Sequence, residues 1–389
     1  MEKFRDKIFN EEVFEKYLKT LPSTKENSLI KNGLFTVVNK YKAKMSEQTG
    51  GYAVLEPIKG RLGGTPVNYD GNTDIPKGAE RDTFFQRKIC YGRAQAWGEY
   101  DFSADISGTN FMAEAQEVKD FWDEKRQETV LSILKGIFSM SGGANGLFVD
   151  KHTYDISDSV DNTLGADSLN RAAQKALGDK KGQFDVIFMH SAISTNLEGL
   201  NLIQFLKYTD ANGIERDLTI GTFNGKLVVV DDEVQELNGY DEAESTTAGA
   251  LQVVASGAST GEINLADVKK GDFYPAGVKA TDYVVAGTKY VSYVFKNGFF
   301  EYEDIGAAVP SEVVRDAYGK GGKNDLISRV REMIVPTYIS YKGTGTVSPE
   351  NSDFADGSNW ELANNDKSGA NKVYVDDKLI PVARIISRG

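Results

Sequence analysis

Between Asn110 and Met140, apolar side chains recur at spacings of three and four residues. Val118, Trp122, Ile133 and Ile137 share one side of this pattern, and charged residues occupy the others. This is the period of an amphipathic helix. About 28 helical residues would extend about 42 Å, and the average helix has only about 11 residues. We therefore predict a spine helix over residues 110–140, ended by the glycine-rich segment SGGANG.

Residues 48–98 have a different pattern. Short apolar runs of β type alternate there with clusters of Gly, Pro, Asn and Asp, and NYDGN at 68–72 is a hairpin-turn signal. This pattern predicts two strands joined by a long, charged, glycine-rich tip. Such a tip has little to bury against its own chain. It is either a disordered loop or an element that rests on a neighbouring molecule, and the sequence leaves both open.

The rest of the chain alternates between helix and strand patterns. A helix is predicted at 165–178, a strand at 184–190, a short helix at 191–200, and a strand pair at 216–232 that turns at Asn-Gly. The segment 236–288, rich in Gly, Ala, Ser, Thr and Asp, is predicted to be an insertion with lower core content. We expect the terminal strands at 331–345 and 378–388 to return to the spine helix, and the first 47 residues to form an arm.

Composition narrows the possible functions. The 389 residues are 40% hydrophobic, enough for a core, and include one cysteine, Cys90, so no disulfide framework or cysteine-rich zinc site is expected. No segment has the apolar length of a membrane span or a signal peptide. The net charge of −12 argues against a protein that grips nucleic acid. An acidic wall would still suit a container for DNA, since a basic wall would retain the polymer during packing.

Residues with catalytic potential are few. His190 and Ser191 follow the predicted strand at 184–190 and could be a base and a nucleophile. However, they are adjacent in sequence and lack the G-x-S-x-G turn, so we interpret Ser191 as the N-cap of the next helix. His152 is predicted to lie in a loop without metal-ligand spacing. Acidic pairs and glycine clusters match no calcium-loop or phosphate-loop pattern. We predict no catalytic, metal or cofactor residues.

Several segments resemble, in the same order, the major capsid proteins of tailed bacteriophages. The first is GRAQAWGEYDFSADISGTNFMAEAQEVKDFWDEKRQETVLSILKGIF, which resembles the junction of hairpin and spine helix in that family. The match is to one branch of that family. Three downstream segments resemble the same branch: FDVIFMHSAISTNLEGLNLIQFL, GTFNGKLVVVDDEV and TKYVSYVFKNGFFEYE. Together the matching segments cover residues 90–140, 184–235 and 288–304.

The resemblance implies an α+β fold, the tailed-phage major capsid fold shared with herpesvirus capsid proteins and encapsulins. Its parts would be an N-terminal arm (1–47), an extended β-hairpin loop (48–98), a peripheral domain (99–163 and 331–389) with the spine helix, and an α/β axial domain (164–330) containing the insertion 236–288. His190 and Ser191 would be structural residues of the axial domain.

The function implied is a structural one. Copies would assemble into pentamers and hexamers of an icosahedral head around double-stranded DNA, in the virion, after assembly in the bacterial cytoplasm. Expected partners are other copies, a portal protein, a decoration protein and DNA held by non-specific contact, with no membrane. Because the chain has no long coiled-coil N-terminal segment, we also expect a separate scaffolding protein, or removal of that segment by a maturation protease.

The hairpin is predicted to lie over the spine helix of the next subunit. Charged side chains of the hairpin would form ion pairs at the rim of this contact. The residues predicted to contact a neighbouring subunit are Arg61, Tyr69, Asp70, Asp74, Lys77, Glu80, Arg81, Arg87, Trp122 and Arg126. Three alternatives remain: an encapsulin-type compartment, another virion protein such as a tail tube, and a hydrolase using His190 and Ser191.

Overall fold

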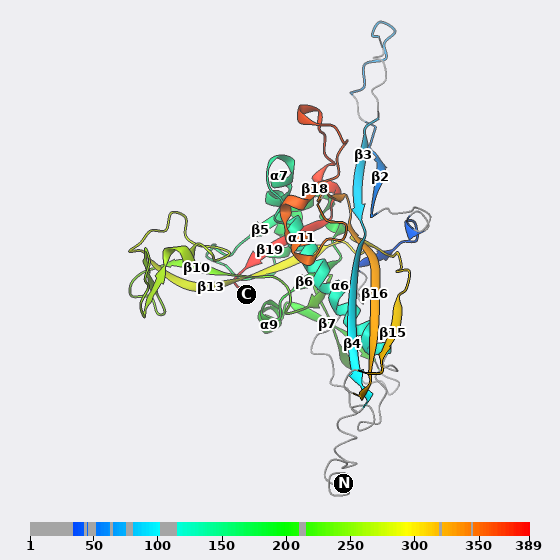
Figure 1. Cartoon of the computed structure of the whole chain (residues 1–389). Coiled ribbons are helices and arrows are strands. Elements are labelled where there is room, and N and C mark those ends of the chain that lie inside the picture. The colour runs from blue at the N-terminus through cyan, green and yellow to red at the C-terminus, as the bar shows by residue number, and fades with distance from the viewer. Residues whose placement is uncertain are drawn as a thin grey trace.

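A computed structural model describes residues 34–42, 45, 52–62, 65–74, 81–101, 115–209, 215–318, 321–343 and 345–389. Most of the predicted arm, residues 1–33, and the start of the predicted spine helix lie outside these residues. The described chain is mixed α and β, as predicted. Figure 1 shows a central body with a two-stranded hairpin projecting from one end and a lobe projecting sideways.

A ten-stranded sheet forms the centre of the body. Strand β6 (Val186–Met189) pairs in parallel with β9 (Lys226–Val230) and antiparallel with β13 (Tyr283–Phe295). The order continues through β8 (Glu215–Phe223) to β7 (Ile203–Thr209), while β19 (Val382–Ser387) pairs with β13 and with β5 (Thr153–Asp155). The apolar run predicted as a strand at 184–190 is therefore confirmed.

Helices cover both faces of this sheet. Ile187 and Met189 of β6 pack with α8 (Ser168–Leu177) and α9 (Ser191–Gly199) in one core cluster. Val186 and Phe188, which point to the opposite face, pack in another cluster with α6 (Ala115–Ile137). Because successive side chains of a strand point to opposite faces, a continuous apolar run is what a strand buried on both sides requires. The 3-10 segment η2 (Gly178–Gln183) connects α8 to β6.

Helix α6 also packs against a five-stranded sheet, so it lies at the centre of the body as a spine. In that sheet β16 (Lys323–Pro336) pairs with β4 (Tyr91–Tyr100) on one edge and with β14 (Phe300–Asp304) and β15 (Ser311–Asp316) on the other. Strand β1 (Phe35–Val37) adds in parallel to β14. Phe121 of α6 meets Trp97 of β4 edge to face, with ring centroids 5.1 Å apart.

The end of the spine helix differs from the prediction. Its described part ends at Ile137 after 23 residues, and a new helix, α7 (Gly143–His152), begins inside the SGGANG segment. Gly142, which precedes α7, and Gly143, its first residue, have φ angles of 78° and 49°, a region that glycine adopts without strain. The prediction that His152 lies in a loop was wrong, because His152 is the last residue of α7 and is buried.

The segment 236–288 forms the lobe at the side of the body (Figure 1). Strand β10 (Glu236–Ala243) pairs with the first half of β13, and β11 (Leu251–Val254), β12 (Glu262–Asn264) and α10 (Leu265–Val268) follow. A small core inside the lobe contains Val253, Val268, Val278 and Val284. The lobe thus has a small core of its own, and its assignment as an insertion stays a prediction.

The C-terminal part packs against α6. It contains β17 (Ile339–Tyr341), α11 (Asn351–Ala355), η4 (Gly357–Asn359), β18 (Trp360–Leu362), η5 (Gly369–Asn371) and η6 (Asp377–Leu379). A Cβ at Gly136 would lie 2.0 Å from the backbone oxygen of Phe354, so only glycine permits this approach of α6 to α11. Strand β16 runs through the predicted domain boundary at 330, and the domain divisions stay a prediction.

Candidate assembly surfaces

The projecting hairpin consists of β2 (Ala53–Lys59) and β3 (Thr83–Ile89) in antiparallel register, from Ala53 opposite Ile89 to Lys59 opposite Thr83. Beyond the ladder, Gly60 N–H donates to the Asp82 oxygen at 2.9 Å, and Arg81 Nε donates to the Gly60 oxygen at 2.6 Å. The hairpin is shorter than the predicted segment 48–98, because Tyr91 and the residues after it belong to β4.

Strand β3 is fixed to the body by hydrogen bonds along its length. The Gln86 Nε2 donates to the backbone oxygens of Pro336 and Ile339, at 2.8 and 2.9 Å. Phe85 N–H donates to the Asn364 oxygen at 2.7 Å, and Arg87 N–H donates to the hydroxyl of Ser340 at 3.2 Å. These bonds fix β3 relative to β17 and to the end of β16.

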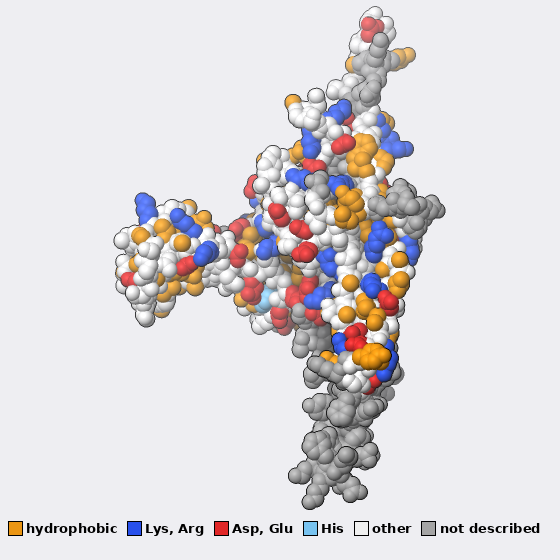
Figure 2. All heavy atoms as spheres, viewed as in Figure 1, with side chains coloured by type: hydrophobic (Ala, Val, Ile, Leu, Met, Phe, Trp, Pro, Cys, Tyr) orange, Lys and Arg blue, Asp and Glu red, His pale blue; other side chains and the backbone are white. Residues whose placement is uncertain are grey.

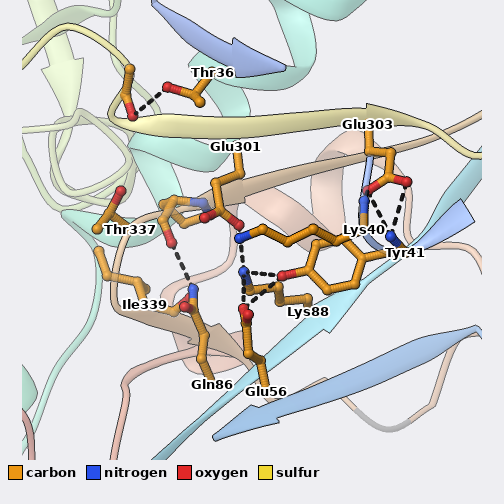
Figure 3. Close-up of polar contacts among 12 residues, drawn as sticks. Thr36, Lys40, Tyr41, Glu56, Gln86, Lys88, Glu301, Glu303, Thr337 and Ile339 are labelled. Atoms are coloured by element: carbon orange, nitrogen blue, oxygen red, sulfur yellow. Dashed lines mark hydrogen bonds and ion pairs between the residues drawn. The ribbon is translucent and has the colours of Figure 1, made fainter. Parts of the chain in front are cut away.

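A buried ionic cluster joins the hairpin base to two other segments (Figure 3). Lys88 of β3 is 2% exposed, and its ammonium pairs with Glu56 of β2 at 2.5 Å and with Glu301 of β14. The same ammonium donates to the hydroxyl of Tyr41 at 2.8 Å, and that hydroxyl donates to Glu56 at 2.6 Å. A lysine is rarely buried to this degree unless it is paired in this way.

The protonation states follow from these contacts. Burial opposes charge on Lys88, but hydrogen bonds to Glu301, Glu56 and Tyr41 outweigh it and raise its pKa above the usual value. Burial also raises the pKa of Glu56, yet the hydrogen bonds from Lys88 and Tyr41 outweigh it and lower that pKa overall. For Tyr41, burial and the hydrogen bond to Glu56 raise the pKa to about 12. At neutral pH the cluster is a lysine cation between carboxylates, with a neutral tyrosine.

The predicted contact residues of the hairpin tip lie apart from the body (Figure 1). Arg61, Tyr69, Asp70 and Asp74 are exposed, and Tyr69 is 91% exposed. Asp70 accepts the N–H groups of two following residues in a turn, and these bonds lower its pKa. Lys77 and Glu80 lie outside the described residues, whereas Arg81 bonds the hairpin neck.

The tip also presents apolar side chains that no sequence pattern marked. Leu62 is 80% exposed and Val67 is 41% exposed, so together with Tyr69 the tip offers apolar surface to water. Exposed apolar side chains on a projecting element suit a contact with another molecule. No periodicity marks these residues, because the described residues of the tip, 61–62 and 65–74, are in neither helix nor strand.

The other predicted contact residues are engaged within the subunit. Arg87 donates to the backbone oxygen of Lys342 at 3.4 Å. Trp122 is 6% exposed, and its Nε1 donates to the hydroxyl of Ser328 at 2.9 Å. Arg126 pairs with Glu332 at 2.7 Å and with Asp123 at 2.6 Å. Trp122 thus has little surface left for a neighbour, and a contact between subunits at these three residues stays a prediction.

The face of the β4–β16–β15 sheet that points away from α6 is open. Alternate residues of β4 from Gly92 to Tyr100 are exposed, and so is every residue of β15. Figure 2 shows hydrophobic side chains scattered among basic and acidic ones over this part of the body. Val314 of β15 is 44% exposed and Tyr100 of β4 is 37% exposed. Among the described residues, this exposed face is a second candidate contact surface.

The His190–Ser191 pair is structural. His190 itself is the N-cap of α9, because its Nδ1 accepts the N–H of Ala192 at 3.1 Å. The prediction that Ser191 caps the helix was therefore wrong by one residue. The His190 Nε2 faces Glu236 at 3.0 Å. With Nδ1 accepting a backbone proton donor and Nε2 bonded to a carboxylate, neither nitrogen can take a proton from Ser191.

The second histidine is also structural. The Nδ1 of His152 donates to the backbone oxygen of Val382 at 2.6 Å, and its ring stacks near Phe148 with centroids 4.2 Å apart. Burial lowers the pKa of His152, which keeps it neutral. Among the residues that the structure describes, no group of three His, Cys, Asp or Glu side chains could hold a metal ion. No helix in the described part is long and apolar enough to span a membrane.

Comparison with known proteins gives the fold. No protein-family model and no curated protein sequence matches the chain. Among solved structures, the capsid asymmetric unit of cyanophage Pam1 is similar over 95% of both chains, with a TM-score of 0.52 and 10% identity.

Two further phage capsids are more distant. The capsid of Ralstonia phage GP4 covers 82% of this chain and 89% of its own, with a TM-score of 0.48 and 10% identity. The capsid of Helicobacter pylori bacteriophage KHP30 covers 98% of both chains, with a TM-score of 0.45 and 11% identity. The predicted fold class is confirmed by the similarity to the Pam1 structure, and this chain has the fold found in that phage capsid.

Proposed function

We propose that the chain is the shell subunit of a phage head, and that copies associate into pentamers and hexamers of an icosahedral capsid. The observation that carries the proposal is the similarity to the cyanophage Pam1 capsid, which extends over 95% of both chains and includes no large unmatched part. The described residues support a mechanical role, since His190 and His152 are both held in structural contacts.

The hairpin is the element that joins subunits in this proposal. Its base is fixed to the body by Gln86 and Lys88, and its tip exposes Leu62 and Tyr69. The tip lies over the spine helix and open sheet of the next subunit. Ion pairs at the rim contribute only about 0–1 kcal/mol each. A closed shell repeats each contact many times, so weak contacts suffice for a stable particle.

The partners follow from this role. The head encloses double-stranded DNA by non-specific contact, and the net charge of −12 keeps the wall from binding the polymer tightly. A portal protein occupies one vertex. A scaffolding protein, a maturation protease and a decoration protein complete the set that we propose. The mature location is the virion, after assembly in the cytoplasm of the bacterial host.

Deleting residues 62–78 tests the proposal. The shortened subunit should fold, because the deletion lies beyond the β2–β3 ladder and its neck. It should not form closed shells, because the tip that contacts the neighbour is gone. Particle formation is measured by sedimentation and electron microscopy, and folding by circular dichroism.

A matched control deletes residues 245–249, an exposed turn of the lobe. This variant should assemble as the unchanged chain does. Normal shells from the subunit that lacks 62–78 would contradict the proposed role of the hairpin.

A further inference from the structure

Strand β14 carries two carboxylates that bind different segments of the chain. Glu301 and Glu303 are two residues apart, so they lie on the same face of the strand. Glu301 pairs with Lys88 at the hairpin base, whereas Glu303 binds the segment 40–42 that precedes the hairpin in sequence. Figure 3 shows the two acids side by side above the hairpin strands.

Glu303 is 1% exposed, and its hydrogen bonds among the described residues are all with backbone N–H groups. Its carboxylate accepts the N–H of Lys40 at 3.0 Å, of Tyr41 at 2.9 Å and of Lys42 at 2.6 Å. The Tyr41 oxygen in turn accepts the N–H of Met45 at 2.8 Å, so these residues begin a helical turn. A buried carboxylate that accepts three N–H groups fixes the backbone of this turn.

Tyr41 extends from that turn into the hairpin base. The residue is 1% exposed, and its hydroxyl accepts from Lys88 and donates to Glu56 of β2. Strand β3 has its own bonds to the body through Gln86. Among the described residues, Glu56 is the β2 side chain that makes polar contacts outside its own strand, with Tyr41 and Lys88 of this cluster.

We propose that residues 40–42 are a clasp that positions the hairpin, with Glu303 holding the clasp and Tyr41 transmitting its position to β2. Glu303 and Tyr41 are both buried, so they act on the hairpin by holding it in place and not by contacting a partner. Movement of the segment 40–42 would then change the orientation of β2 and of the tip beyond it. The consequence for assembly rests on the proposed function, but the coupling itself is a property of the single subunit.

Hydrogen exchange of the full chain, kept below its assembly concentration, tests the coupling. Glu303→Gln removes the charge that holds the clasp, and among the described residues the hydrogen bonds of Glu303 go to residues 40–42 and not to the hairpin strands. We expect faster exchange in residues 38–45 and also in residues 53–59, by about fivefold or more, the effect of losing one net hydrogen bond. Peptides from β6 and β13 should be unchanged. Because the subunit is unassembled, failure of the capsid proposal would not alter this result.

Tyr41→Phe and a double variant show the route of the coupling. Tyr41→Phe should raise exchange in 53–59 about fivefold, since it removes one hydroxyl and keeps the ring. In Glu303→Gln/Tyr41→Phe the exchange of 53–59 should be no faster than in the more affected single variant, because both act on one path. Asp155→Asn is the matched control. Its carboxylate also accepts a backbone N–H, from Ser157 at 2.9 Å, but it lies in the ten-stranded sheet.

The outcomes are separable. Faster exchange in 53–59 in both single variants, with the Asp155→Asn control unchanged there, supports the clasp. If Glu303→Gln affects only 38–45, the clasp does not position the hairpin and the inference is overturned. Should Glu303→Gln fail to fold, as loss of protection in β6 would reveal, Tyr41→Phe decides alone. Exchange of 53–59 at the rate of the unchanged chain would then overturn the inference.

Discussion

Replacing Lys88 by methionine is the sharpest test of what holds the hairpin base. The change keeps the apolar stem and removes an ammonium that is 2% exposed and pairs with Glu56 and Glu301. Removing one partner of a buried ion pair costs about 3–5 kcal/mol. The two carboxylates keep 32% and 29% of their side-chain surface exposed and can be partly rehydrated. We therefore expect a loss of about 2–3 kcal/mol in the free energy of unfolding.

Urea unfolding of the unassembled subunit, followed by circular dichroism, measures this loss. The subunit must stay unassembled because association would add to the apparent stability. Lys151→Met is a matched control, since Lys151 pairs with Asp377 at 2.5 Å but is 56% exposed. It should lose less than about 1 kcal/mol.

A triple variant separates the ion pair from packing. Adding Glu56→Gln and Glu301→Gln to Lys88→Met removes the unpaired carboxylates and should recover more than half of the lost stability. Equal losses for Lys88→Met and Lys151→Met would refute the reasoning, because burial would then make no difference to the strength of the pair.

Three further predictions follow from the same contacts. The pKa of Glu56 is lowered in the fold, so its contribution to stability is present above its usual pKa of 4.5 and is lost as the pH falls below it. The pKa of Lys88 is raised, so its contribution to stability is present below 10.5 and is lost above it. The protection of residues 53–59 from exchange, corrected for the intrinsic pH dependence of exchange, should therefore be highest between these limits, and protection that stays constant down to pH 3 would contradict this. Gly136→Ala should lower the free energy of unfolding by at least about 1–3 kcal/mol in urea, because its methyl group would collide with α11, whereas Gly182→Ala, with open space at its Cβ, should not. His190→Ala should lower the free energy of unfolding by about 1 kcal/mol through loss of the α9 cap, and Ser191→Ala should lower it less. Thermal unfolding measures both, and a larger loss for Ser191→Ala would contradict the assignment of His190 as the cap.

The parts of the fold that could be predicted are those with a strong local pattern. The three- and four-residue period of α6, the apolar run of β6 and the turn signals of the hairpin each depend on neighbours in sequence. Helix α7 was missed because its sequence, GANGLFVDKH, has two glycines and no amphipathic period. The charged tip residues and Tyr69 were predicted as contacts, whereas the exposed apolar side chains of Leu62 and Val67 were not.

The ionic cluster could not have been predicted from the sequence. Lys88 is the last of three consecutive polar residues in TFFQRKI, and a lysine in such a polar run is ordinarily expected to face solvent. Its partners Tyr41 and Glu301 are 47 and 213 residues away along the chain, so only the tertiary fold brings them together. The sequence placed His190 correctly at the junction of strand and helix. Serine is the commoner N-cap residue, so the preference for serine led to the prediction of Ser191 in place of its neighbour His190.

Electron microscopy of the purified chain, expressed alone and together with its neighbouring genes, tests the central claim most directly. Light scattering on the same samples gives the mass of the particles. The proposed function predicts closed shells, or rings of five and six subunits, in at least one of the two preparations. A species that stays strictly monomeric or dimeric in both would contradict the claim that this chain builds a capsid.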